Sequence, residues 1–111
     1  MPVPLYQAKA EFFRTLGHPA RIRVLELLSE KPCPVHELLA AIEIEASNLS
    51  QQLSVLRRSG LVTQRREGGE VIYSLAVPEV RDLLAAARGI LRAQIADQSG
   101  LVDELSRGMN R

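Results

Sequence analysis

The chain is 111 residues long, has a formal net charge of +1 and is 46% hydrophobic. This length fits one domain with a modest core, and so small a net charge does not by itself indicate a polyanionic partner. No apolar run approaches the roughly 20 residues that a helix needs to span a bilayer, and the N-terminus lacks the basic start and apolar stretch of a secretory signal. Because Cys33 is the only cysteine, we expect no intrachain disulfide and a location in the reducing cytoplasm.

Three helices are predicted in the first 45 residues. Residues 5–16, about 20–29 and about 35–42 each place apolar side chains at helical spacing, which gives each segment one face for burial. Pro19 suits the first turn of the second helix, because proline lacks the amide hydrogen that this position leaves unpaired anyway. Residues 31–34, Lys-Pro-Cys-Pro, form a stiff connector before the third helix.

The next predicted helix has one apolar and one polar face. Leu49, Leu53 and Leu56 recur at positions i, i+4 and i+7 and therefore share a face that is expected to be buried. The opposite face carries hydrogen-bonding groups and no carboxylate. Its members are Ser47, Gln51, Ser54 and Arg58.

The boundaries of this helix and the segment after it are also predicted. Ser47 is a good N-cap, since its hydroxyl can accept from a free amide of the first turn. Gly60 can adopt the left-handed conformation that ends a helix. Two runs typical of strands, residues 61–66 and 70–76, flank Gly68-Gly69, a pair that favours a tight hairpin turn.

Charge is distributed unevenly along the chain. Residues 46–66 contain Arg57, Arg58, Arg65 and Arg66 and no acidic residue, whereas residues 1–45 hold five basic and six acidic side chains and residues 77–111 hold five of each. An α-helix fits the major groove of DNA, and Asn, Gln, Ser and Arg side chains read base edges. The pattern predicts a DNA-binding helix-turn-helix at about 35–59 and a wing at about 61–76. The alternative is an ordinary surface helix beside a solvated hairpin.

Residues 79–105 form one long helical pattern with more apolar surface than a small winged domain can cover. We expect this helix, together with residues 5–16, to pack against a second copy of the chain in a two-fold dimer. The alternative is a helix that folds back on its own domain. The predicted fold is therefore a single domain, 1–111, mainly α with a two-stranded β-wing. The predicted dimer-interface residues are Leu5, Phe12, Leu16, Leu83, Leu84, Ala87, Leu91 and Ile95, and the stripe continues to Leu101 and Leu105.

Four stretches of the sequence together resemble a known family. They are Phe-Phe-Arg-Thr-Leu-Gly-His-Pro-Ala-Arg from residue 12, Val-His-Glu-Leu-Leu from residue 35, Ser-Asn-Leu-Ser-Gln-Gln-Leu from residue 47 and Glu-Gly-Gly-Glu-Val-Ile-Tyr from residue 67. From about residue 9 to 92 the chain resembles the ArsR/SmtB family of bacterial repressors. The resemblance implies a homodimer that binds a palindromic operator and releases it on sensing an effector, often a metal.

The resemblance also implies which side chains contact DNA. It assigns Ser47, Ser50, Gln51 and Gln52 to the recognition helix, with Arg65 and Arg66 in the wing. The full predicted set is Ser47, Asn48, Ser50, Gln51, Gln52, Ser54, Arg57, Arg58, Arg65 and Arg66.

The metal sites of that family are poorly matched. One family site uses Cys-Val-Cys at the start of the third helix, where this chain has Pro34-Val35-His36, and Cys33 falls one place too early. The other site takes carboxylate and histidine ligands from the last helix. The positions that align with it hold Val77, Glu79, Ile90 and Ala93.

Of those four aligned side chains, only the carboxylate of Glu79 can bind a metal ion, and a tight site needs several donors. We therefore expect no cofactor. Weak binding of nickel or zinc through His18, Cys33, His36 or Glu79 is the alternative. Otherwise the two histidines are capping or surface residues, and Cys33 is a half-buried structural thiol.

The predicted function is a sequence-specific DNA-binding transcriptional repressor. The alternative is a dimeric protein-interaction module, or a DNA-binding subunit whose effector, a metal such as nickel or zinc, is sensed by a partner protein. Salt-dependent binding to duplex DNA distinguishes a repressor from an interaction module. We expect no enzymatic activity, because the sequence shows no nucleophile–base pair and no Gly-rich phosphate motif.

Overall fold

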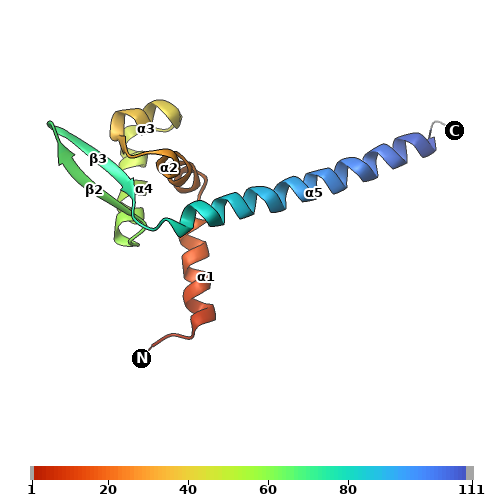
Figure 1. The fold of residues 1–111 in the computed structure, drawn as a ribbon, viewed down its shortest axis with the longest axis horizontal. Coiled ribbons are helices and arrows are strands. Elements are labelled where there is room, and N and C mark those ends of the chain that lie inside the picture. The colour runs from red at the N-terminus through yellow and green to blue at the C-terminus, as the bar shows by residue number, and fades with distance from the viewer. Residues whose placement is uncertain (1, 110–111) are drawn as a thin grey trace. The chain divides into compact units, whose positions relative to one another are not determined.

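Figure 1 shows the computed structural model of the chain, in which the backbone of residues 2–109 and the side chains of residues 2–98 are described. Residues up to Val80 form one compact unit, and Arg81 onward form a second one. None of the described helices combines the length and apolarity that a membrane span requires. The elements are α1 (Leu5–Leu16), α2 (Pro19–Glu30), β1 (Cys33–Pro34), α3 (Val35–Ala41), α4 (Ala46–Arg58), β2 (Val62–Glu67), β3 (Glu70–Leu75) and α5 (Glu79–Met109).

The first three helices confirm the prediction from apolar spacing. Helix α1 has the predicted bounds, and α2 is one residue longer at each end. The start of α2 is fixed by Pro19 at its first position and by His18, whose Nδ1 accepts a hydrogen bond of 3.1 Å from the backbone amide of Ala20. His18 is thus a capping residue, one of the two roles that the sequence favoured for it.

The sheet has three strands, in the order β1-β3-β2, and both pairs are antiparallel. The sequence predicted the two strands of the wing but missed β1. In β1, Cys33 pairs with Tyr73 and Pro34 pairs with Ile72. A two-residue strand shows no alternation that could reveal it, and its proline is tolerated because β1 lies at the edge of the sheet.

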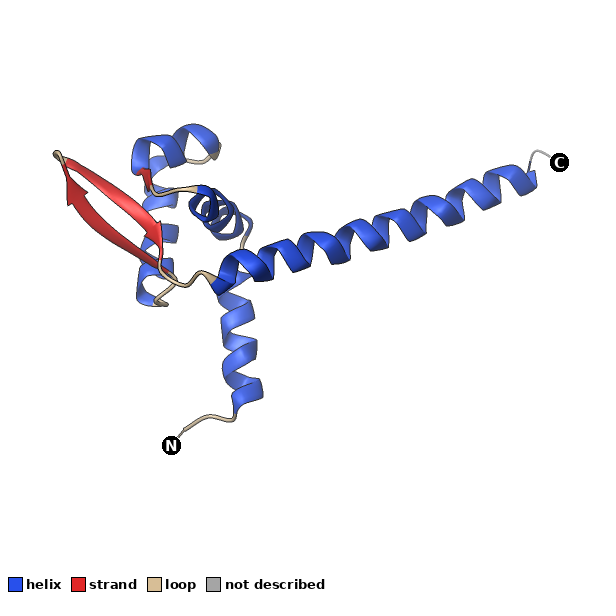
Figure 2. Ribbon diagram, in the orientation of Figure 1, coloured by secondary structure: helices blue, strands red, loops and turns tan. Residues whose placement is uncertain are grey.

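The hairpin predicted at Gly68-Gly69 is confirmed. Both glycines have positive φ, 58° and 84°, as the two central residues of a type I′ turn require. The register runs without interruption from the pair Glu67–Glu70 at the turn to the pair Val62–Leu75 at the base. The two strands form a ribbon that extends beyond α2, α3 and α4 (Figure 2).

The core lies beneath α4. Leu49, Leu53 and Leu56 have exposed fractions of 0%, 2% and 0%, so the predicted apolar face is buried. They share the core with Leu25 of α2 and Leu38 of α3, both fully buried, and α4 also contacts α2 and β2. Burying one leucine side chain stabilises a fold by about 1.5–3 kcal/mol. This burial fixes which face of α4 is left for solvent.

The two ends of α4 compare differently with the prediction. The helix begins at Ala46, and its N-cap is Glu45 without a side-chain hydrogen bond, so the prediction of Ser47 as N-cap was wrong. The prediction for Gly60, with φ of 77°, is confirmed. The amides of Gly60 and Leu61 donate to the carbonyls of Arg57 and Leu56, both at 3.0 Å. These two bonds form a Schellman motif, which leads directly into β2.

Replacing Gly60 should destabilise the fold through backbone strain alone. A Cβ at this position would meet no atom within 4 Å, so the cost of Gly60→Ala comes from the positive φ and should be about 1–2 kcal/mol. Gly17→Ala is the matched control. Gly17 has φ of −76°, and a Cβ there makes ordinary contacts of 3.4–3.5 Å. If urea unfolding showed that both variants lose the same free energy of unfolding, backbone strain at Gly60 would not be the cause.

Candidate nucleic-acid interface

The outer face of α4 is polar and carries no carboxylate. Ser47, Ser50, Gln51 and Ser54 are all exposed, on the side of the helix away from the buried leucines. The last turn adds the exposed Arg57 and Arg58. These are donors and acceptors of the kinds that read base edges and phosphates. The helix thus presents a continuous hydrogen-bonding surface.

Gln52 does not lie on that surface, and here the structure corrects the predicted set. Its side chain is only 6% exposed. Its Oε1 accepts a hydrogen bond of 2.8 Å from Nε of Arg21, and its Nε2 donates one of 2.9 Å to Oδ1 of Asn48. Gln52 therefore joins α2 to α4 from beneath the exposed face. Sequence reasoning missed this role because the partner on α2 is 31 residues away.

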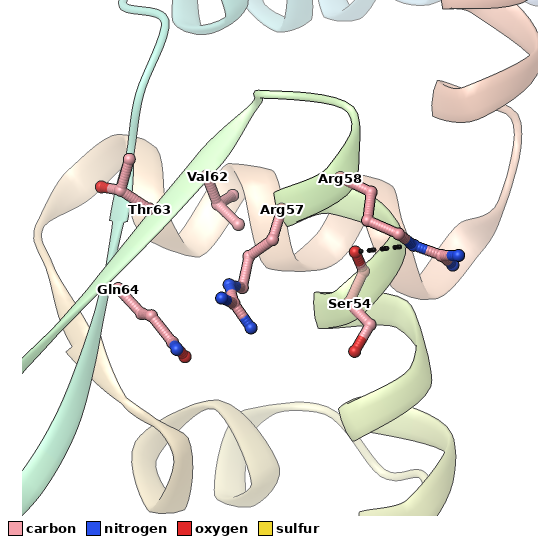
Figure 3. Close-up of a pocket in the computed structure, with 6 residues that line it drawn as sticks. All are labelled: Ser54, Arg57, Arg58, Val62, Thr63 and Gln64. Atoms are coloured by element: carbon pink, nitrogen blue, oxygen red, sulfur yellow. Dashed lines mark hydrogen bonds between the residues drawn. The ribbon is translucent and has the colours of Figure 1, made fainter.

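A cleft of about 780 Å³ opens between the last turns of α4 and strand β2. Figure 3 shows the side chains of Arg57 and Gln64 pointing into it from the two elements, while Arg58 turns away, its Nε 3.4 Å from the backbone oxygen of Ser54. A guanidinium, an amide and a hydroxyl around one cleft suit an oxyanion such as a backbone phosphate. Its remaining lining residues are Val62 and Thr63. Gln64 was not among the residues predicted to contact DNA.

The two wing arginines lie on opposite faces of the hairpin, because successive residues of a strand point to opposite sides. Arg65 is held there by Glu67, with Nε and Oε2 3.0 Å apart, and donates to Oγ of Ser74 at 3.2 Å. Arg66 is on the same side as Gln64, is exposed, and has no ion pair among the described side chains. Arg66 therefore continues the face that contains the cleft. Period-2 alternation in the sequence could have separated the two arginines.

The candidate metal ligands are not grouped together. His36 is exposed, with Nδ1 3.3 Å from Oε1 of Glu70, so it links α3 to the start of β3. His18 caps α2. Among the side chains described, no three His, Cys, Asp or Glu residues are arranged to hold a metal ion. Glu79, at the start of α5, is exposed.

Cys33 is a buried thiol, 5% exposed, and its Sγ donates to the backbone oxygen of Lys31 at 3.4 Å. Burial, with a smaller contribution from the Glu37 carboxylate, raises the pKa of this thiol above its ordinary value of 9.0, while Lys31 opposes the change. The thiol is therefore protonated at neutral pH. Since the thiolate is the form that binds metals and attacks electrophiles, Cys33 is poorly suited to either role.

The chain is similar to a known protein family and to several known proteins. The bacterial regulatory proteins of the arsR family match residues 18–64. The HTH-type transcriptional regulator Rv0081 of Mycobacterium tuberculosis is 53% identical over 106 residues, which cover 95% of this chain and 93% of the relative. The biofilm growth-associated repressor of Agrobacterium fabrum is 36% identical over 97 residues, with coverage of 84% and 83%.

Solved structures share the fold. The crystal structure of M. tuberculosis Rv0081 superimposes with a TM-score of 0.79, at 55% identity, over 87% of this chain and 98% of that one. The homodimeric winged helix-turn-helix DNA-binding domain of Mb0332 from Mycobacterium bovis gives a TM-score of 0.71 at 26% identity, with coverage of 82% and 84%. The predicted winged helix-turn-helix fold is confirmed.

The environment of Cys33 predicts how it reacts. Because the folded-state pKa is raised, the stability this thiol contributes is complete below its unfolded pKa and is lost as the pH rises through the folded pKa. At neutral pH, iodoacetamide should alkylate the native protein more slowly than the urea-unfolded chain. Mass spectrometry follows the reaction without ambiguity, since the chain has one cysteine. Equal rates for the folded and unfolded chain would show that folding neither shields the thiol nor suppresses its ionisation.

Proposed function

The chain belongs to the ArsR family of bacterial transcriptional regulators, and from this premise we propose that it is a repressor that binds a palindromic DNA operator as a homodimer. Relatives that are 53% and 36% identical over most of their length support the family. The observation that carries the proposal is the exposed face of α4, free of carboxylates and continuous with the cleft at Arg57 and the hairpin face at Arg66. A bacterial operator also implies a cytoplasmic location.

In the proposed complex α4 lies in the major groove. Its N-terminal part, with Ser47, Ser50 and Gln51, faces the base edges, as the first turns of a recognition helix do. Arg57 at the end of α4 and Arg66 on the hairpin contact phosphates on either side of the groove, which positions the helix without reading sequence. Arg65 contributes less, because Glu67 already neutralises it. Gln52 is left out of the contact set, since it is buried.

The homodimer is proposed because each compact unit exposes large apolar side chains. On α1, Leu5 and Phe13 are 69% and 54% exposed; on α5, Ile90, Leu91 and Ile95 are 60%, 56% and 61% exposed. Apolar patches of this kind mark interaction surfaces. A two-fold partner suits a palindrome, because each copy then reads one half-site.

The predicted interface set needs one correction. Leu16 is only 5% exposed within the chain itself, so it belongs to the core and is not free to contact a partner. Phe12, Leu83 and Leu84 are half-buried, and Ala87 is exposed. Leu101 and Leu105 lie outside the residues whose side chains are described.

We propose that operator release does not depend on a tightly bound metal at either site typical of the family. Tight transition-metal sites need several converging donors. At the last helix Ile90 and Ala93 supply hydrocarbon, and at the third helix Pro34 takes the place of a thiolate. Weak binding of nickel or zinc, through His36 for example, is compatible with this proposal. The effector is then a ligand of another kind or a partner protein.

Two substitutions separate base reading from phosphate contact. Gln51→Ala should cost about 1–3 kcal/mol on a specific duplex and relax base preference, whereas Arg66→Ala should weaken specific and random duplexes alike and reduce the salt slope by about one. Arg65→Ala is the matched control and should have a smaller effect, because Arg65 is paired on the opposite hairpin face. Fluorescence anisotropy at several salt concentrations measures all three. If the protein does not bind duplex DNA, or if its affinity for duplex DNA does not depend on salt, the proposed function is refuted.

A substitution that places a charge on the exposed apolar face of α5 tests the dimer. Leu91→Glu should dissociate the dimer, because it buries an unpaired carboxylate where a leucine stabilises by about 1.5–3 kcal/mol per copy. Ala93→Glu, about half a helical turn away on the same helix, is the control and should leave the dimer intact. Sedimentation equilibrium gives the mass of each variant. A wild-type monomer at micromolar concentration would contradict the proposal.

A further inference from the structure

Three side chains form a directed chain of hydrogen bonds beneath α4. Nε of Arg21 donates to Oε1 of Gln52 at 2.8 Å, and Nε2 of Gln52 donates to Oδ1 of Asn48 at 2.9 Å. Arg21 is itself held in place, since its NH1 donates to the backbone oxygen of Thr15 at 3.1 Å. This series of hydrogen bonds starts at the end of α1, passes through α2 and ends at Asn48, an exposed residue in the first turn of α4.

The direction of this chain is fixed by chemistry. A guanidinium group has five donors and no acceptor, so Gln52 must turn its oxygen toward Arg21. Its amino group must then face Asn48, and Asn48 must offer its own oxygen. Reversing Gln52 would place donor against donor inside a site that is only 6% exposed, where unpaired donors are costly.

Because its oxygen is turned toward the buried Gln52, Asn48 offers an external partner its amino group. Its oxygen is engaged by Gln52, and its Nδ2 amino group makes no hydrogen bond within the described part of the chain. An asparagine usually reads adenine with both ends of its amide, the oxygen accepting from N6 and the nitrogen donating to N7. That arrangement needs both ends to face the base, whereas here one end faces inward.

We propose that Asn48 reads DNA as a donor only, through an acceptor on a base edge in the major groove such as purine N7, guanine O6 or thymine O4. In this scheme Arg21 is a positioning residue: it touches no base, yet it sets through Gln52 which end of the Asn48 amide faces the groove. The inference rests on the proposed operator binding. It extends that proposal by assigning the chemical character of one contact.

The first experiment tests the contact itself. Duplexes selected by the wild-type protein from a random pool would be remade with single analogues that remove one group: 7-deazapurines for N7, 2-aminopurine for guanine O6, 5-methyl-2-pyrimidinone for thymine O4, purine for the adenine N6 amino group, and methylphosphonates for phosphate charge. Each is measured with wild-type protein and Asn48→Ala. We expect one acceptor-lacking base to cost about tenfold in affinity with wild type and nothing further with Asn48→Ala.

The outcomes of this experiment are distinct. The inference is supported if Asn48→Ala abolishes the effect of removing a base acceptor and changes the effect of no other analogue. Coupling to the adenine amino group, to a methylphosphonate only, or to no analogue overturns it. If the wild-type protein selects no sequence from the pool, the proposed function has failed rather than the assignment of direction.

The second experiment tests the positioning role of Arg21. Arg21→Met removes the donor that fixes Gln52, so Asn48 can use both ends of its amide, and the affinity for adenine at the base pair read by Asn48 should rise about tenfold relative to the other bases. Arg21→Lys, which also has only donors, should retain the wild-type preference. A merely structural role would weaken all sequences equally. Urea unfolding checks that the variants are folded.

The orientation of the Gln52 and Asn48 side-chain amides can also be determined without DNA. In the free protein, NMR should show slow hydrogen exchange for the side-chain amino group of Gln52 and fast exchange for that of Asn48. The reverse pattern would overturn the inference whatever the DNA experiments give.

Discussion

The structure depends on the burial of one face of α4. Leu49, Leu53 and Leu56 are buried on the side of α4 that contacts α2 and the base of the hairpin. Because a helix is a rigid rod, fixing one stripe of side chains fixes the rotation of the whole surface about its axis. The polar side of α4 faces outward as a consequence. Gly60 then turns the chain directly into β2, so helix and hairpin keep one relative orientation.

The local electrostatic field at the surface of α4 depends on that arrangement more than on the net charge of the protein. A net charge of +1 gives the molecule no general affinity for a polyanion. Several cations elsewhere are neutralised by a carboxylate nearby, as Arg14 is by Glu11 and Arg23 by Glu26. Arg57 and Arg66 have no such partner among the described side chains. A local field is created by leaving particular arginines unpaired on the surface that α4 and the hairpin share.

Much of this architecture could be predicted from local signals. The leucine spacing of α4, the glycine pair of the hairpin and Pro19 of α2 each act within a few residues and were interpreted correctly. The failures concern distant partners. Strand β1 exists only because β3 lies beside it. Gln52 can be buried without loss because Arg21 and Asn48 satisfy both ends of its amide. Helical spacing does not show whether a polar residue at the edge of an apolar face is solvated or satisfied from within.

The short strand β1 has a mechanical consequence for the wing. It pairs with β3 at Ile72 and Tyr73, so the wing is a three-stranded sheet at its middle and a two-stranded ribbon from Val71 to the tip. Such ribbons twist more strongly than wider sheets and are only marginally stable alone. The contact of His36 with Glu70 near the tip is exposed on both sides, and exposed side-chain pairs contribute little to stability. The part of the wing that pairs with β1 is thus the stiffer one, and Arg66, opposite Val71, belongs to the compliant segment beyond it.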